Sequence, residues 1–232
     1  MWAWFERATV AESQVALLET DRRLSEIVIE TVRLWVQRLV VDLNLCPFAK
    51  RELVKNRVRF VVSDAQSEEQ LLLALQTELE RLERDASIET TLLIHPHVLQ
   101  HFYDYNQFLD SADRLLVQMQ LDGVYQIASF HPQYQFAGTA PDDAENYSNR
   151  SPHPLLHLLR EDSLERAIAG YPDVEQIPIR NIALMNATGK QAMQILLESC
   201  LIDAKIPAGP DATPARTECP RAITDHNTGA NQ

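Results

Sequence analysis

The residues best suited to chemistry in this sequence are histidines that directly follow apolar runs. His95 comes after the run 91–94 and stands before a proline. His131 has the same setting after the run 124–130, and Asp64 follows an earlier run of the same kind. If these runs are neighbouring parallel strands, two imidazoles and one carboxylate lie at one rim of the sheet, where ligands of such sheets collect. Imidazole carries protons near neutral pH and is the most common transition-metal ligand. The alternative is that each His-Pro pair only ends a strand and begins a helix.

A metal site is one interpretation of this rim. His95 and His131 would be ligands, completed by Cys46 or Asp64, and such mixed ligands favour zinc or iron over magnesium. Two further pairs of histidines have the i, i+4 spacing that can place two ring nitrogens on one metal when the segment is helical. They are His97 with His101 and His153 with His157. No carboxylate stands at a fixed offset from either pair, so we expect the first pair at a solvated helix edge instead.

Cys46 lies beside a basic segment in an otherwise acidic chain. It precedes a proline, which favours the first position of a helix, so we predict Cys46 at the N-cap of a short helix that ends at Leu53. The positive end of a helix lowers the pKa of a thiol placed there. Residues 50–59 carry five basic side chains against one acidic side chain, which predicts a seat for an anion with Lys50 and Arg59 as substrate-binding groups. The alternative is a buried, unreactive cysteine beside an ordinary solvated surface.

The longest polar stretch, residues 131–154, gathers amide, hydroxyl, carboxylate and guanidinium groups. Loops of this length inside domains are functional or disordered, and the prolines and aromatics here argue against disorder. Within it, Asn146 is a candidate for orienting a substrate, and Arg150 for holding a carboxylate or phosphate with two hydrogen bonds. A helix predicted over 155–169 follows, and it carries His157 as a second proton carrier or binding group.

The elements that must position these residues alternate along the chain. Apolar runs predict strands, and the helical spacing of apolar residues between them predicts crossover helices, which favour a parallel sheet. We therefore predict an α/β domain of three layers, in which a small, mainly parallel sheet of β-α-β-α-β order is flanked by helices. An antiparallel edge strand within 133–137 is the alternative, and Asn44 is expected to end the first helix. The strands are expected at 58–62, 91–94 and 124–130, and the helices at 26–43, 67–82, 98–119, 155–169 and 188–201.

Composition and charge place the chain among soluble globular proteins. Of its 232 residues, 45% are hydrophobic and 23% charged, and the formal net charge of −12 argues against general binding of nucleic acid or anionic membranes. No apolar run suits a signal peptide or approaches the roughly 18 residues of a membrane span, so we expect a cytoplasmic protein. We expect one α/β domain over 25–202, a helical extension over 1–24 and a disordered tail rich in proline and alanine over 203–232. Three scattered cysteines are too few for a disulfide framework, and six glycines without close repetition give no phosphate-binding loop.

Six longer motifs are shared with one known family. They read LNLCPFAK from residue 43, RVRFV from 57, ASFHP from 128, QFAGTAPDD from 135, NYSNRSP from 146 and HLLRE from 157. Over about residues 25–200 the sequence thereby resembles an uncharacterised bacterial family, domain of unknown function 1415. The resemblance implies no activity. It does place within the family's motifs the residues Cys46, His131, Asn146, Arg150 and His157. His153 departs from the pattern, in which an aromatic residue is expected, and this weakens a metal role for His153 with His157.

Three interpretations of function remain open. In the first, the protein is an enzyme acting on a small anionic metabolite, with His131 as general acid or base and Cys46 as nucleophile or thiolate ligand. Arg150 would clamp the anion, Asn146 would orient it, and His157 would be the second proton carrier. In the second, the protein binds zinc or iron through the rim of strand-end histidines. In the third, it is a non-catalytic module that binds a small molecule or a partner, and the cysteine is inert. The sequence indicates no oligomeric state.

Overall fold

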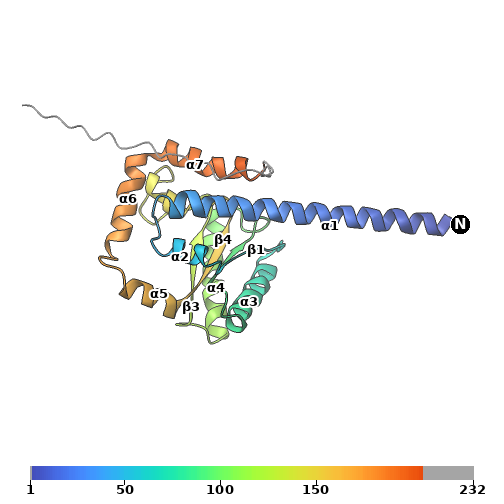
Figure 1. Cartoon of the computed structure of the whole chain (residues 1–232), viewed down its shortest axis with the longest axis horizontal. Helices are drawn as coiled ribbons and strands as arrows, with labels where there is room; N and C mark the ends of the chain where they lie inside the picture. The colour runs from blue at the N-terminus through green and yellow to red at the C-terminus, as the bar shows by residue number, and fades with distance from the viewer. Residues whose placement is uncertain (1, 206–232) are drawn as a thin grey trace, which may run out of the picture.

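Four strands form a mixed sheet in the structure, a computed structural model that describes residues 2–205, with side chains from residue 18 onward (Figure 1). They are β1 (Val58–Val62), β2 (Thr90–Ile94), β3 (Tyr125–Phe130) and β4 (Leu155–Arg160), in the order β1-β2-β4-β3. β1 and β2 are parallel, whereas β4 runs antiparallel to both β2 and β3. The α/β class and the three expected strands are confirmed, the latter to within one residue at each end. The prediction of a mainly parallel sheet is wrong, because the sequence predicts a helix where β4 lies.

The strand β4 forms in spite of its local sequence. Its residues, Leu-Leu-His-Leu-Leu-Arg, include four helix-favouring leucines and do not alternate between polar and apolar. A short apolar run of this kind cannot be told from a buried helix by periodicity alone. β4 is hydrogen-bonded along both edges, and Leu155, Leu156 and Leu158 are fully buried, so tertiary pairing overrides local propensity. The predicted helix is shortened to α5 (Glu161–Ala169), and the segment 133–137 is loop rather than an edge strand.

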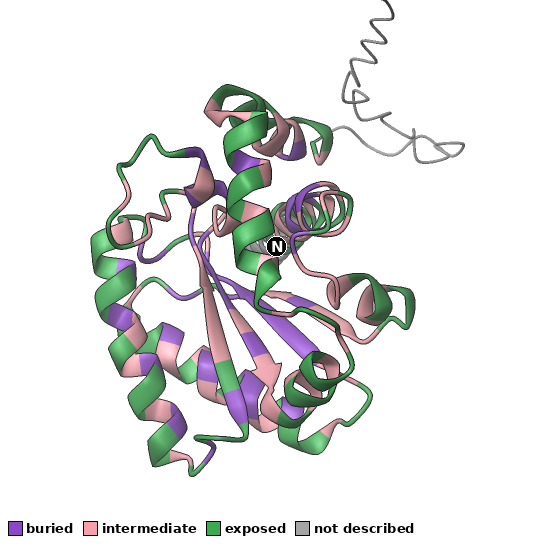
Figure 2. Ribbon diagram, turned by 90° about the vertical axis from the view of Figure 1, so that its left-hand side faces the viewer, coloured by how far each residue is buried: buried purple, intermediate pink, exposed green. Residues whose placement is uncertain are grey.

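Helices α3 (Glu68–Arg84) and α4 (Phe102–Gln118) pack on one face of the sheet. Both show the predicted apolar spacing, and most of their leucine and aromatic side chains pack in the core against the strands. Figure 2 colours the buried residues of both helices purple. The hydroxyl of Ser67 accepts a hydrogen bond from the backbone N–H of Gln70, which confirms the expected start of α3. α4 begins later than its apolar spacing predicts, because the chain before it turns and holds Leu99 at a φ of +57°.

The other face carries α1 (Trp2–Trp35), which extends far beyond the body of the molecule (Figure 1). It continues into a π-helical turn, η1 (Val36–Val41), and the chain then reverses at Asn44, whose φ of +54° fits the predicted helix end. The remaining helices are α2 (Ala49–Val54), α6 (Gln176–Thr188) and α7 (Lys190–Asp203). Buried residues of α1, η1, α6 and α7 form a second core against the sheet.

The helix α6 has no counterpart among the predicted elements. A proline at its third position and a mixture of polar and apolar residues conceal it in the sequence, although the first turn of a helix tolerates proline. α7 lies close to the helix expected at 188–201. The expected boundary after residue 24 falls within α1, and the expected tail lies outside the described residues from 206 onward. The division into extension, domain and tail therefore stays a prediction. Among the described helices, none is both long and apolar enough to cross a membrane.

Candidate functional site

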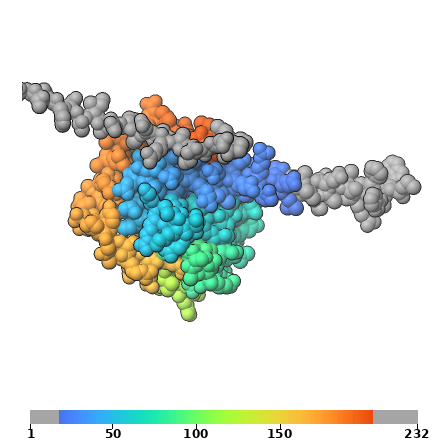
Figure 3. Space-filling model, in the orientation of Figure 1, coloured from blue at the N-terminus to red at the C-terminus, as the bar shows by residue number. Residues whose placement is uncertain are grey.

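A largely apolar hollow of about 660 Å³, called the sheet-face cavity below, opens on the face of the sheet that α1 covers. Its floor is made by the side chains of Thr90, Leu92, Ala128, Phe130, His157 and Leu159. Its walls come from η1, the segment around α2, and α5. They include Trp35, Val36, Val40, Phe48, Leu53 and Leu164. The space-filling view shows α1 and α2 next to each other on the outer surface of this face (Figure 3). Of the predicted site residues, Cys46 and His157 line this cavity.

The π-helical turn η1 forms one wall of the cavity. Trp35 precedes it, and Val36 and Val40 lie within it. After the turn, the carbonyl of Val40 accepts the backbone N–H of Leu45 at 2.9 Å, which draws the Cys46 segment back beneath the helix. π-helical turns inside longer helices are rare and are frequent at functional sites.

His157 is the histidine that the cavity exposes. Its Nε2 lies 2.7 Å from the hydroxyl of Thr90, and that hydroxyl also donates to the carbonyl of Leu158 at 2.6 Å. Burial lowers the pKa of His157 to about 4, so the ring is neutral at pH 7. The i, i+4 spacing of His153 and His157 does not place them on one helix face, because His157 lies in β4 and His153 in the loop before it. His97 and His101 likewise precede α4 rather than share it.

Cys46 lies at the wall of the cavity in a setting that differs from the predicted one. α2 begins at Ala49, two residues later than expected, and its N-cap is Phe48 rather than Cys46. Burial raises the pKa of the Cys46 thiol, and the backbone N–H groups of Phe48 and Ala49 only partly oppose this. The expectation of a lowered thiol pKa is therefore wrong, and Cys46 is a neutral thiol at pH 7.

The basic segment 50–59 does not present free cations to the cavity. Arg57 donates to the carboxylate of Glu52 at 2.8 Å and lies 3.1 Å from that of Glu89. Arg59 points to the opposite face of the sheet, where it pairs with the buried Glu78 of α3 at 2.6 Å. Lys50, the other predicted substrate-binding cation, is exposed and does not line the cavity. The arginines of the expected anion seat are thus paired with Glu52 inside the segment and with Glu78 and Glu89, which are distant in sequence.

His95 and His131 lie on the other side of the sheet and are fully buried. The Nδ1 of His131 accepts the backbone N–H of Gln133 at 3.0 Å, so its Nε2 donates to the carbonyl of Leu99 at 3.1 Å. His95 gives its Nδ1 hydrogen to the carbonyl of Val98, and its Nε2 is buried without a partner. Burial lowers the pKa of both rings, to about 4 for His95. Both side chains therefore support the turns that follow their strands.

The metal interpretation finds no support in this arrangement. Tyr105 lies between the two rings, with centroid distances of 5.8 Å to His95 and 5.1 Å to His131. Asp64 is exposed, and Cys46 belongs to the sheet-face cavity. Throughout the described part of the chain, no three His, Cys, Asp or Glu side chains are grouped so that they could hold a metal ion.

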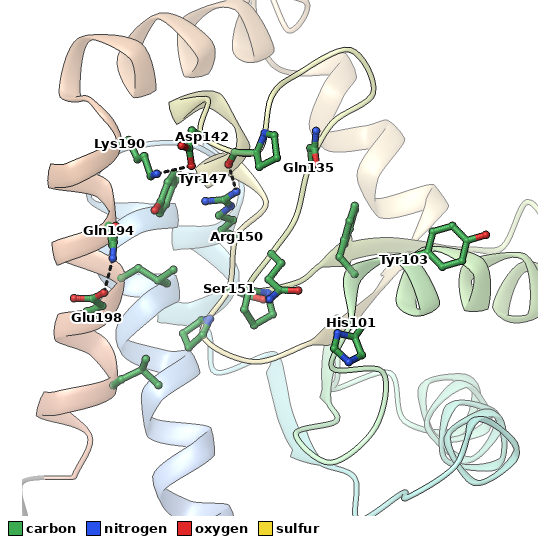
Figure 4. A pocket seen from close by; sticks show the side chains of 17 residues that line it. His101, Tyr103, Gln135, Asp142, Tyr147, Arg150, Ser151, Lys190, Gln194 and Glu198 are labelled. Atoms are coloured by element: carbon green, nitrogen blue, oxygen red, sulfur yellow. Dashed lines mark hydrogen bonds and ion pairs between the residues drawn. The ribbon is translucent and has the colours of Figure 1, made fainter.

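A second hollow of about 740 Å³, called the loop groove, lies between the polar loop and α7. Figure 4 shows Lys190 and Glu198 of α7 on one side and His101 on the other, with Arg150 between them. Lys190 pairs with Asp142 and so ties the start of α7 to the loop. The groove occupies part of the rim predicted at the strand ends, since it lies just after β3. Cys46, expected to contribute to this rim, does not line the groove.

The two substrate-binding residues predicted in this loop hold the loop together. Arg150 donates to the carbonyls of Tyr134 and Pro141 and lies over the ring of Tyr147. Asn146 is fully buried, and its side chain bonds Phe136, Thr139 and Ala140 at 2.8–3.0 Å. A long polar loop without regular strands thereby gains a fixed shape.

A family model described as "Protein of unknown function (DUF1415)" matches residues 27–195, almost three quarters of the chain. The chain belongs to this family. The DUF1415 region contains every residue named above for the sheet-face cavity, and it begins within α1, beyond the part of that helix that leaves the body. No curated protein and no solved structure matches the chain.

Sequence reasoning missed several groups of the DUF1415 cavity. Thr90 fixes the His157 ring, but it is one of two threonines at the start of an apolar strand and nothing in the sequence distinguishes it. Trp35 is buried with an indole N–H that has no acceptor among the described residues, and it packs edge-on against Phe130 at 5.3 Å. The many apolar residues of the helix expected at 26–43 are the one signal that pointed to this wall, since such a helix is typical of a buried element.

Proposed function

We propose that the protein binds a small, largely apolar molecule in the sheet-face cavity. The observation that carries the proposal is the cavity itself, whose volume of about 660 Å³ lies in the range of small-molecule sites. Apolar side chains from the sheet, η1 and α5 make up most of its lining, and His157, Thr90 and Cys46 are its uncharged polar groups together with Ser163. Six charged side chains also line it: Arg51, Glu52, Arg57, Glu89, Arg160 and Arg166. This combination of an apolar lining and a few convergent polar groups is typical of ligand sites. Among the three interpretations of the sequence, it favours the binding module.

The proposal is tested with Nile red, an uncharged dye whose fluorescence rises in apolar surroundings. The wild-type protein should bind the dye with saturation. Ala128→Phe, which adds a ring to the cavity floor, should weaken binding at least about tenfold. Ala86→Phe is the matched control, because Ala86 is exposed in the turn after α3 and outside the cavity. Equal binding by all three proteins would reject the cavity as the ligand site.

A second candidate function, thiol-dependent catalysis, is favoured by one observation. The thiol of Cys46 and the neutral imidazole of His157 line the same cavity, so a base and a nucleophile share one apolar space. His131, the general base expected from the sequence, is outside this cavity and has both ring nitrogens bonded. Catalysis by the protein therefore centres on Cys46 and His157 in this proposal.

Alkylation of Cys46 by iodoacetamide tests the coupling. The protein should carry Cys200→Ala and Cys219→Ser so that Cys46 is its one thiol, because Cys200 is also a free cysteine and Cys219 lies outside the described residues. If His157 takes the proton of Cys46, His157→Phe should slow alkylation at pH 7 about tenfold or more. An unchanged rate would remove the catalytic proposal and leave the binding proposal intact.

A further inference from the structure

The hydrogen bonds of Thr90 determine which nitrogen of His157 carries a hydrogen. A threonine hydroxyl has one hydrogen, and a backbone carbonyl can only accept. The 2.6 Å contact between the Thr90 hydroxyl and the Leu158 carbonyl therefore uses that hydrogen. The Thr90 oxygen must then accept from Nε2–H of His157 at 2.7 Å. In the neutral ring the remaining nitrogen, Nδ1, is an acceptor with a free lone pair.

This Nδ1 has no hydrogen-bond partner among the described residues, and it is not one of the sealed, unpartnered buried atoms. The ring of His157 lines the cavity and is only partly buried. This separates Nδ1 from the Nε2 of His95 and the Nε1 of Trp35, which are both sealed from solvent. A molecule in the cavity can therefore satisfy His157 by donating a hydrogen bond.

The cavity offers no free positive charge to an anion. Arg57 is held by the carboxylates of Glu52 and Glu89. Arg160 donates to the carbonyls of Leu82 and Ile88, on the far side of β4. The two remaining arginines of the lining are exposed to solvent: Arg51 is 67% exposed and contacts Glu52, and Arg166 donates to Ser163. A carboxylate or phosphate inside this apolar space would lack a counter-charge, which is strongly unfavourable.

We infer that the cavity takes an uncharged molecule with an apolar body and one hydroxyl-type donor, which gives its hydrogen to Nδ1 of His157. The inference rests on the proposed function, because it names the class of ligand for the same cavity. It replaces the anionic metabolite expected from the basic segment 50–59 with a neutral alcohol or phenol. A hydroxyl suits the position because its hydrogen points to the nitrogen while the rest of the molecule stays among apolar side chains.

Three probes of similar shape test the class at pH 7, with affinities measured by calorimetry. They are 1-naphthol, 1-methylnaphthalene and 1-naphthoate. The wild-type protein should bind 1-naphthol about tenfold more tightly than 1-methylnaphthalene, the worth of one well-made hydrogen bond, and 1-naphthoate most weakly. His157→Phe should bind 1-naphthol and 1-methylnaphthalene equally. His157→Gln should keep part of the preference, because its amide can donate to Thr90 and its carbonyl can accept from the hydroxyl. His97→Phe is the matched control, since His97 is exposed and outside the cavity, and it should behave as wild type.

The nitrogen itself can be observed in the wild-type protein, so the test does not depend on the folding of a variant. With ¹⁵N-labelled histidine, 1-naphthol should shift the Nδ1 resonance of His157 and 1-methylnaphthalene should not. Equal affinity for these two probes, with no shift, would overturn the inference while the proposed function stands. Tightest binding of 1-naphthoate would overturn the uncharged class. No binding of any probe or of Nile red would reject the proposed function itself.

Discussion

The histidines at the ends of β2 and β3 and the histidine within β4 use their ring nitrogens in different ways. At the carboxyl ends of β2 and β3, His95 and His131 direct their hydrogen bonds to the backbone of the following turns. In the middle of β4, His157 bonds one neighbouring side chain and leaves Nδ1 open to a cavity. Burial lowers the pKa of all three rings, so the shift alone does not distinguish them. The difference lies in where the second nitrogen points.

The comparison teaches that the hydrogen-bond partners of a histidine ring indicate better than its place in the sheet whether it can bind a ligand. Strand ends in parallel sheets are good places to look for ligands, which made His95 and His131 the first candidates. Both ring nitrogens of His131 are bonded to backbone groups, and the unpartnered Nε2 of His95 is sealed from solvent, so neither ring offers a nitrogen that a substrate can reach. His157 offers such a nitrogen, although it stands within a strand that the sequence does not predict.

Lowering the pH should reduce the free energy of unfolding through histidines of both kinds, and we expect this to be the largest effect. An ordinary histidine titrates near 6.5, whereas folded His95 and His157 titrate near 4. Above pH 6.5 the rings are neutral in both states and cost nothing. Between pH 6.5 and about 4 the unfolded chain binds protons that the folded chain does not, so stability is lost as the pH falls. Over this range each ring lowers the free energy of unfolding by up to about 1.4 kcal/mol for each unit by which the pH falls. Urea unfolding at successive pH values measures this decrease.

The part of this acid-induced loss of stability that is due to His157 can be isolated with His157→Gln. This variant lacks the titrating ring but can retain the hydrogen bond to Thr90. The variant should lose less stability than wild type over this pH range. If the two proteins lost stability in parallel, His157 would not be neutral in the fold, and the argument for Nδ1 as an acceptor would fail.

Much of the fold was predictable because its signals are local. The apolar runs of β1, β2 and β3 and the leucine stripe of α3 are signals contained within single elements. β4 was not predictable in this way, since its pairing partners, β2 and β3, lie far away in the sequence and only tertiary contacts select a strand over a helix. That single error placed His157 on a helix and made the predicted sheet mainly parallel.

The candidate site was less predictable than the fold. Residue type identified Cys46 and His157, but their common cavity depends on the π-helical turn, which the sequence does not predict, and on α5, which it predicts only as part of a longer helix. The basic segment 50–59 misled because Glu78 and Glu89, which neutralise Arg59 and Arg57, are 19 or more residues away. Charge patterns describe a surface well only when the partners are neighbours in the chain.

Replacing His131 gives the second-largest effect and separates the two groups directly. His131→Ala removes two hydrogen bonds and a fully buried ring, so we expect a loss of about 3 kcal/mol in the free energy of unfolding. His157→Phe should lose only about 1 kcal/mol, because Thr90 keeps its hydrogen bond to Leu158. Chemical denaturation measures both values. Folded His131→Ala should still bind Nile red, whereas an unchanged stability together with lost binding or turnover would return His131 to the functional group.

The smallest effect comes from His101, the N-cap of α4, next to the buried pair. Its backbone has the extended conformation of a cap, but its side chain makes no capping hydrogen bond. Serine in this position could accept from the first turn of α4, with Asp104 at the third helical position, so His101→Ser should raise the free energy of unfolding by about 0.5–1 kcal/mol. It also removes a neighbouring charge that lowers the pKa of His131. Because His101 lines the loop groove and not the sheet-face cavity, the preference for 1-naphthol should be unchanged. A variant that is stabilised but loses this preference would show that the two groups of histidines are coupled, and the distinction between a structural and a functional group would no longer hold.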